Sequence, residues 1–232
     1  MTGLRSARPP TVQQYVLESL RAAITTGELA PGAPIRQDTV AERLGVSRVP
    51  LREALKILEG EGQVVYLPRR GYIVAELSLE DLVEVYRIRD LLESEAARAA
   101  VGRLTDADLE RVAEAQRDVE QAATRGDLLA MTEANRRFHF AILGGCGMPR
   151  LLRIIRNLWD STDAYRSVYY NTTANRARVE REHRAILAAV RRRDADDLVR
   201  LLAVHRDHAV AALREIIAPP DGTARRAPSR PE

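Results

Sequence analysis

The chain has 232 residues, more than one small domain requires, so we expect two domains. Hydrophobic residues make up 45% of the sequence and aromatic residues only 4%, which favours a core of Leu, Ala, Val and Ile packed between helices. The formal net charge of +3 is too small for a general nucleic-acid binder that is basic over its whole surface, but it allows one local basic patch.

The cysteine and hydropathy patterns indicate a compartment. Cys146 is the single cysteine, so no internal disulfide can form and a reducing environment is expected. The N-terminus lacks the apolar core of a secretory signal, and no stretch is apolar and long enough to span a membrane. We therefore expect a cytoplasmic protein with no membrane partner.

In chain order, the first clear elements are two helices joined by a tight turn. Residues 39–44 predict a short amphipathic helix that ends at Gly45, a residue that accepts the left-handed backbone after a helix. A second helix is predicted to begin at Ser47, whose hydroxyl is a good N-terminal cap, with Pro50 in the first turn. Its apolar residues recur at helical spacing and predict a buried face: Leu51, Ala54, Leu55 and Leu58.

The opposite face of this second helix is basic, because Arg48, Arg52 and Lys56 are four residues apart and share one stripe. Taken alone, such a stripe is typical of any helix face exposed to water. It is also typical of a helix that lies in the major groove of DNA and is held from behind by its apolar face. Arginine can pair bidentately with guanine, so Arg48 and Arg52 are candidate base contacts, whereas Lys56 is a candidate phosphate contact.

A β-hairpin is predicted next. Residues 63–67 and 72–74 are β-prone runs on either side of a short turn that contains Pro and Gly. The tip carries Arg69 and Arg70 just before Gly71, and arginine at such a tip can meet phosphates or enter a minor groove.

Residues 11–77 resemble the winged helix-turn-helix of GntR-type transcription regulators. The resemblance rests on Leu20–Ile24, Gly27–Leu29, Pro31–Gly32, Ala41–Arg48, Pro50–Leu55, Leu58–Glu59, Gly62 and Gly71. The sequence departs from the family at Val49, where Thr is frequent, and at Asp38, where a basic residue is frequent. The resemblance implies a double-stranded DNA operator, for which we predict these contacts: Ser47, Arg48, Val49, Arg52, Lys56, Arg69, Arg70 and Gly71.

After the winged helix-turn-helix domain (1–77), the sequence predicts an all-α bundle over 78–217 and a disordered tail over 218–232. The tail follows a Pro-Pro-Asp-Gly stop and is rich in Pro, Arg and Ala. The fold class is therefore mainly α. We expect six helices in the bundle, over residues 78–101, 105–124, 126–143, 149–170, 175–193 and 194–217.

Three histidines interrupt the apolar faces of these helices. His183 and His205 each lie eleven residues from Asp194, where the last two helices are predicted to turn back on one another. Helices rise about 1.5 Å per residue, so the two imidazoles should lie at the same level. Asn135 and His139, one turn apart, could complete the site from a third helix. Three imidazoles and one oxygen suit a divalent transition metal such as Zn, Ni, Fe or Mn.

This half of the chain resembles the FCD domain of the FadR-type branch of the GntR family, through residues 135–139, Glu182-His183 with Ile186, and His205. The resemblance implies a metal held by three histidines and an Asp or Asn, with a small carboxylate effector beside it. Asn135, where many members have Asp, is a neutral and weaker ligand.

Arg89 and Glu93 also face inward on the first helix of the bundle. They form either a structural ion pair or a clamp in which Arg89 binds an effector carboxylate and Glu93 orients it. His208 is offset from the apolar stripe, and we interpret it as a residue of the rim.

These patterns favour a metabolite-responsive transcription regulator that is not an enzyme. Reading two half-sites of a pseudo-palindromic operator requires a homodimer. The resemblance implies repression as the commoner arrangement. Two alternatives stay open: a regulator that senses its effector without metal, and an enzyme that uses a metal-bound water with Glu182 or Glu93 as base.

Overall fold

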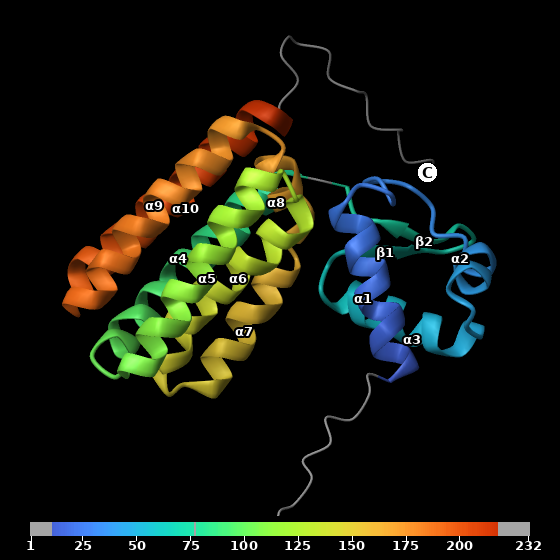
Figure 1. Cartoon of the computed structure of the whole chain (residues 1–232). Helices are drawn as coiled ribbons and strands as arrows, with labels where there is room; N and C mark the ends of the chain where they lie inside the picture. The colour runs from blue at the N-terminus through green and yellow to red at the C-terminus, as the bar shows by residue number, and fades with distance from the viewer. Residues whose placement is uncertain (1–10, 77, 218–232) are drawn as a thin grey trace, which may run out of the picture. The chain divides into compact units, whose positions relative to one another are not determined.

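The computed structural model describes residues 11–76 and 78–217, and most of these residues are helical, which confirms the mainly α fold class (Figure 1). The predicted disordered tail lies outside the described residues. The chain divides into two compact units. One contains the described residues up to Glu76 together with Trp159–Ala164, and the other contains the rest of the described chain.

The first unit is a winged helix-turn-helix, as predicted. Its elements are α1 (Val12–Thr25), α2 (Gln37–Leu44), α3 (Arg48–Gly60), β1 (Val64–Leu67) and β2 (Gly71–Val74). All five contribute apolar side chains to one core. Gly45 ends α2 with φ 65°, which confirms the left-handed turn expected between the two helices.

The wing is an antiparallel hairpin in which Val64 pairs with Val74 and Leu67 pairs with Gly71. Val64 and Val74 are buried, so the register fixes one face of the hairpin on the core. Arg69, at the tip, has a φ of 68°, a left-handed conformation that costs a residue with a Cβ about 1–2 kcal/mol.

The second unit is a helical bundle. Apart from Trp159–Ala164 at the junction of α7 and α8, it contains α4 (Leu79–Val101), α5 (Asp106–Arg125), α6 (Leu128–Leu143), the short 3-10 helix η1 (Gly144–Cys146), α7 (Pro149–Asp160), α8 (Asp163–Tyr170), α9 (Thr173–Arg192) and α10 (Ala195–Ile217). Two of the predicted helices begin with a side-chain cap at the first residue of the predicted range. The hydroxyl of Ser78 accepts a hydrogen bond from Asp81 N, and Thr105 forms a capping box with Asp108.

The prediction of a single helix over 149–170, and with it the count of six, is wrong, because α7 and α8 are separate. The break falls in the polar run from Asp160 to Asp163. Side chains of Ser, Thr and Asp compete with the helix for backbone groups. Here the Thr162 hydroxyl donates to Trp159 O at 3.1 Å, as does its own backbone N–H.

The hairpin of α9 and α10 turns as predicted. Arg193 ends α9 with φ 55°, and its guanidinium donates to Val101 O and Gly102 O at the end of α4, both at 3.4 Å. These bonds tie the tip of the hairpin to the end of α4.

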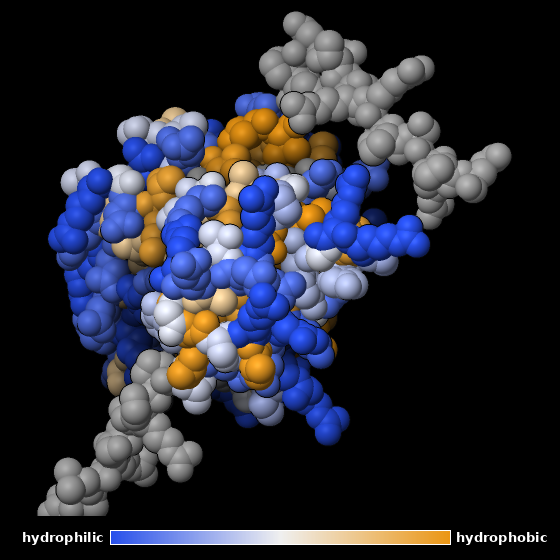
Figure 2. Space-filling model, turned by 90° about the vertical axis from the view of Figure 1, so that its right-hand side faces the viewer, coloured by the Kyte–Doolittle hydropathy of each residue, from blue (hydrophilic) through white to orange (hydrophobic). Residues whose placement is uncertain are grey.

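Hydrophilic side chains cover much of the face drawn in Figure 2, with hydrophobic residues in patches between them. Across the described residues, no helix combines the length and the apolar character that crossing a membrane requires.

Candidate functional sites

The first candidate site is the outer face of α3. Leu51, Ala54, Leu55 and Leu58 are completely buried, as predicted, and they fix the helix to the core. The basic stripe on the opposite face, Arg48, Arg52 and Lys56, is exposed. The helix therefore presents three cations and, near its start, the side chain of Val49, which is 65% exposed.

The start of α3 differs from the prediction. Ser47 occupies the N-cap position with extended backbone, but its side chain makes no capping hydrogen bond. A capping hydroxyl accepts from the backbone N–H two or three residues later, and Pro50, the third residue after Ser47, has no N–H. Pro50 thus removes one of the two donors that the hydroxyl would need, and the exposed Ser47 side chain makes no bond to its own helix.

Arg48 has a partner that the prediction did not include. Its Nε lies 2.5 Å from Asp38 Oδ1 of α2, and both side chains are about 70% exposed. Such an exposed pair contributes at most about 1 kcal/mol, so it orients Arg48 without locking it. The pairing also offsets the negative charge of Asp38, the position at which the family frequently has a basic residue.

A hollow of about 500 Å³ lies between the start of α2, the start of α3 and the wing. Arg36, Arg48 and Arg70 line it, together with the first turn of α2. The N-cap residue Arg36 offers no side-chain acceptor to that turn. Asp38 also lines the hollow and pairs with Arg48, so the backbone N–H groups at the helix start and the guanidiniums of Arg36 and Arg70 are the groups suited to an anion. Arg36 was missed from the sequence, although a cation directly before a helix start is unfavourable for the helix dipole and could have drawn attention to it.

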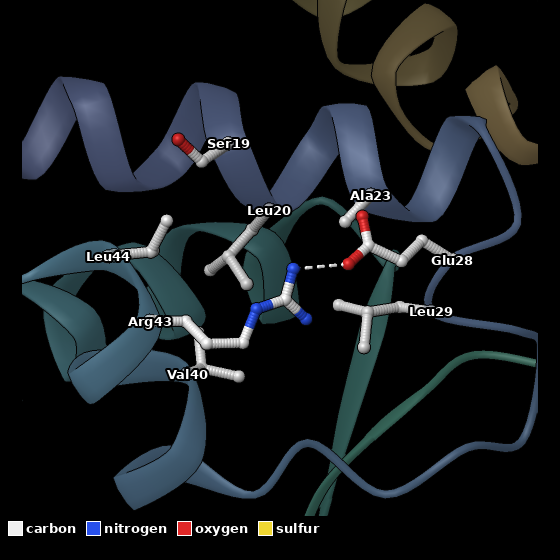
Figure 3. Close-up of a pocket in the computed structure, with 8 residues that line it drawn as sticks. All are labelled: Ser19, Leu20, Ala23, Glu28, Leu29, Val40, Arg43 and Leu44. Carbon is white, nitrogen blue, oxygen red and sulfur yellow. Dashed lines mark hydrogen bonds and ion pairs between the residues drawn. The ribbon is translucent and has the colours of Figure 1, made fainter.

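A smaller pocket of about 180 Å³ lies between α1 and α2 in the same unit (Figure 3). Leu20 and Ala23 of α1 line it together with Val40 of α2. An ion pair between Arg43 and Glu28 crosses the pocket. Its lining is mostly apolar apart from this pair, and none of the predicted site residues lies in it.

The second candidate site is a buried histidine cluster in the helical unit. His139 of α6, His183 of α9 and His205 of α10 come together so that one ring nitrogen of each lies within 4.8 Å of those of the other two. The ring centroids of His183 and His205 are 5.0 Å apart, which agrees with the equal depth predicted from the turn. The structure thus brings together the three histidines that the sequence selected.

Hydrogen bonds behind two of the rings determine which nitrogen faces the cluster. His183 Nδ1 lies 3.1 Å from Gln116 Oε1, and the amide nitrogen of Gln116 donates elsewhere, to Glu120 Oε1 at 3.0 Å. Gln116 Oε1 is therefore an acceptor, His183 Nδ1 carries the proton, and the buried His183 Nε2, which has no hydrogen-bond partner, presents a lone pair.

His205 is held in the same way. Its Nδ1 lies 2.7 Å from Glu182 Oε2, and His208 bonds the other oxygen of the same carboxylate at 2.6 Å. His208 is exposed, as predicted for the rim, but its partner Glu182 was not foreseen. Burial alone would raise the pKa of Glu182, yet the hydrogen bonds to the two histidines outweigh burial and lower it. Glu182 is therefore a carboxylate that orients the imidazole of His205.

Burial keeps the imidazoles of His139 and His183 in the neutral form. Burial lowers the pKa of His183 well below its ordinary value, and His205 lowers it further. Burial has the same effect on His139, reinforced by the neighbouring histidines and by Arg89 and Arg206. Neutral imidazole is the form that binds a metal ion.

Asn135 lies one helical turn before His139 on α6. It is 2% exposed, and its Oδ1 is buried with no hydrogen-bond partner among the described residues. An unpaired buried amide oxygen costs about 1–3 kcal/mol, so this position is expensive in the apo protein. Together with His183 Nε2 it leaves two unsatisfied acceptors, and the residues therefore fit a divalent cation.

A buried charge network follows the cluster along α4 and α10. Arg89 Nε donates to Glu93 Oε1 at 2.8 Å, and Arg206 Nη1 donates to Glu93 Oε2 at 2.9 Å. Arg206 also pairs with the partly buried Asp90. Burial alone would lower the pKa of Arg89, but Glu93 outweighs it and the guanidinium stays charged. The predicted Arg89–Glu93 pair is present, whereas Arg206 was not predicted, because it meets Glu93 across 113 positions of the sequence.

Residues 12–74 match the bacterial regulatory proteins of the gntR family, and residues 84–208 match the FCD domain. This chain belongs to the GntR family. Over 206 residues, this GntR protein is 31% identical to the HTH-type transcriptional regulator McbR of Escherichia coli K12. The aligned region covers 88% of this chain and 93% of McbR. The HTH-type transcriptional repressor RspR of the same organism is 26% identical over 93% of each chain.

Solved structures agree with this assignment. Escherichia coli McbR/YncC superimposes with a TM-score of 0.79 at 29% identity, covering 88% of this chain and 98% of the other. A putative GntR regulator from Rhodococcus sp. RHA1 gives a TM-score of 0.76 at 25% identity, with 88% and 97% covered. The GntR protein is therefore a DNA-binding transcription regulator with an FCD domain, and its relatives are regulators rather than enzymes.

Proposed function

We propose that this regulator binds a pseudo-palindromic operator as a homodimer, and that a divalent metal and a small carboxylate in the FCD domain control that binding. The observation that carries the proposal is the buried cluster of three histidines, two of which are oriented from behind by Gln116 and Glu182. The operator is double-stranded DNA, and we propose that the protein binds it in the cytoplasm.

In the DNA half, Arg48 and Arg52 are proposed to contact base edges in the major groove. The exposed Val49 is proposed to meet the methyl group of a thymine, because an apolar side chain at the start of α3 cannot accept or donate a hydrogen bond. The operator of this member would then differ from that of relatives with Thr at this position.

The remaining contacts of this half are proposed to involve the phosphate backbone. Arg36 and Arg70 line the hollow at the start of α2, Ser47 has an exposed hydroxyl with no capping bond, and Lys56 lies two turns further along α3. At the wing, Arg69 is presented by the strained tip. Gly71 (φ 80°) follows it without a side chain that could obstruct the backbone of the operator.

In the FCD half, the three histidines would hold the metal through imidazole nitrogens and Asn135 would supply the oxygen. Zn, Ni, Fe and Mn all suit this donor set. The four ligands are uncharged, so none of them compensates the charge of a divalent ion in a buried site. A carboxylate effector would supply that negative charge, and we therefore propose that metal and effector each increase the affinity of the other.

Arg89 and Arg206 are proposed to attract the carboxylate toward this site. Glu93 bonds both guanidiniums, so the three buried side chains carry one net positive charge, which the half-exposed Asp90 beside Arg206 offsets in part. Without Glu93, the two guanidiniums would lie buried as unpaired like charges, so Glu93 is needed for the structure. The same two guanidiniums are groups that can bind a carboxylate.

Effector binding would be read out on DNA through a coupling of roughly 1–3 kcal/mol. RspR is named a transcriptional repressor, and we propose repression relieved by the effector for this protein too.

The test uses untagged protein and measures metal content, together with the shift of the unfolding midpoint by acetate and citrate before and after chelation. We expect stoichiometric metal, a midpoint shift that needs the metal, and loss of metal in His183→Ala with operator binding retained. Equal metal content in wild type and in a His183→Ala/His205→Ala variant would refute the metal site. A midpoint shift that survives chelation would instead favour a regulator that senses its effector without metal.

A further inference from the structure

The pocket between α1 and α2 is used neither by the proposed operator contacts nor by the proposed metal site (Figure 3). Its apolar lining comes from α1, from the chain that follows α1 and from α2, and consists of Leu20, Ala23, Leu29, Val40 and Leu44. Leu29, Val40 and Leu44 are only partly buried, since they pack at the edge of the core of the winged helix-turn-helix. The pocket therefore has apolar surface that an apolar ligand would remove from water.

The volume of the pocket limits the size of a ligand. An apolar cavity of about 150 Å³ is large enough to bind benzene. This pocket has a volume of about 180 Å³, so it accepts one six-membered ring or a branched chain of similar size. Sites for drug-sized ligands begin at about 300 Å³. The pocket therefore suits a small molecule with a single compact apolar group.

The guanidinium of Arg43 lies among these apolar side chains, with the carboxylate of Glu28 to one side of it (Figure 3). Only Nη2 of Arg43 bonds Glu28, and among the described residues Nε and Nη1 make no hydrogen bond. The two side chains are 64% and 50% exposed, so water screens their ion pair and the pair is weak. The planar guanidinium therefore has donors left for a second carboxylate.

We propose that the pocket between α1 and α2 binds a small monocarboxylate with a benzene-sized apolar group. The apolar group packs against the lining, and the carboxylate accepts hydrogen bonds from Nε and Nη1 of Arg43. This site belongs to the DNA-binding unit, so it is separate from the effector site proposed for the FCD domain and needs no metal. Val40 and Arg43 belong to α2, whose first turn lines the hollow proposed for operator phosphate. A ligand held against α2 therefore acts on the DNA-binding unit directly.

The test titrates benzoate into full-length, metal-free protein and follows the methyl signals of leucine and valine by NMR. Benzoate should shift the methyl signals of Leu29, Val40 and Leu44, because its ring lies against them. Acetate lacks the apolar group and benzyl alcohol lacks the charge, so each should bind at least about fivefold more weakly than benzoate. These methyl signals unmoved at about 20 mM benzoate, where a Kd of about 5 mM would already give mostly bound protein, would overturn the site. Benzylamine binding more tightly than benzoate would overturn the assignment to an acid.

Substitutions of the two charged residues test the role of Arg43, and both side chains are exposed, so the fold should tolerate either change. Arg43→Gln should weaken benzoate binding about fivefold and leave benzyl alcohol binding unchanged. Glu28→Gln should have the opposite effect and strengthen benzoate binding, because it removes a negative charge beside the ligand. Glu42→Gln changes an exposed acid of α2 outside the lining and is the matched control, with wild-type binding expected. Benzoate affinity that is unchanged in Arg43→Gln, or lowered in Glu28→Gln, would overturn the proposal.

Discussion

Gln116 offers the sharpest test of the proposed metal site in the histidine cluster. Its side chain is 4% exposed, lies on α5, and is not proposed to touch the metal. Its oxygen accepts from His183 Nδ1, and this bond decides that Nε2 presents a lone pair. Replacing the amide with an apolar group of similar size, Gln116→Leu, removes the acceptor without removing a ligand.

The expected magnitude follows from burial. His183 is completely buried, so water cannot replace the lost acceptor, and the unpaired N–H costs about 1–3 kcal/mol of folding stability. The imidazole is then free to carry its proton on Nε2, the atom that must bind. Loss of such an outer partner lowers metal affinity about 10- to 100-fold, or about 1.4–2.7 kcal/mol.

Competition with a chromogenic chelator measures this affinity directly. Gln121→Leu, an exposed substitution on the same helix, is the matched control and should bind metal like wild type. If Gln116→Leu bound metal within twofold of the control, the hydrogen bond would not set the tautomer and the reasoning would fail.

Three further outcomes are expected. Replacing the operator thymine that Val49 meets by uracil should weaken wild-type binding about fourfold, because one methyl contact is lost. Val49→Ala should abolish that difference. Equal binding of the wild type to the thymine and uracil operators would contradict the proposed contact. Arg69→Gly should raise the free energy of unfolding by about 1 kcal/mol while weakening operator binding, as denaturant titration and fluorescence anisotropy would show. Metal-free protein should lose stability as the pH falls below about 6.5, because the unfolded chain protonates His139 and His183 while the folded chain, with their lowered pKa values, does not. The two histidines contribute a slope approaching about 2.7 kcal/mol per pH unit, and His183→Gln should halve it; an unchanged slope would count against the neutral imidazoles.

Local patterns predicted much of this molecule. The register of His183 and His205 followed from counting residues back from the turn of the hairpin, because two packed helices share one rise per residue. The buried face of α3 and the glycine turn before it followed from periodicity alone. These features depend on residues that are close in sequence, or on the rule that residues equally far from a helix–helix turn lie at the same level.

The features that were not predicted depend on contacts between residues distant in sequence, or on the backbone N–H that proline lacks. Gln116 meets His183 across 67 positions, and Arg206 meets Glu93 across 113, so no spacing rule connects them. The absent cap at Ser47 could have been predicted, because Pro50 was visible and its missing N–H is a property of the residue itself. The break between α7 and α8 was also visible as a polar run, but helical periodicity on both sides hid it.

Pro50 has a consequence for anyone who engineers this protein. Restoring a backbone N–H with Pro50→Ala would let Ser47 close the first turn of α3, so a screen for thermal stability would favour that change. The stabilised variant would carry a hydroxyl already engaged with its own helix. If Ser47 contacts the operator as proposed, selection for stability and selection for DNA binding would act in opposite directions on this side chain, and a library scored by melting temperature alone would favour variants that bind the operator less well.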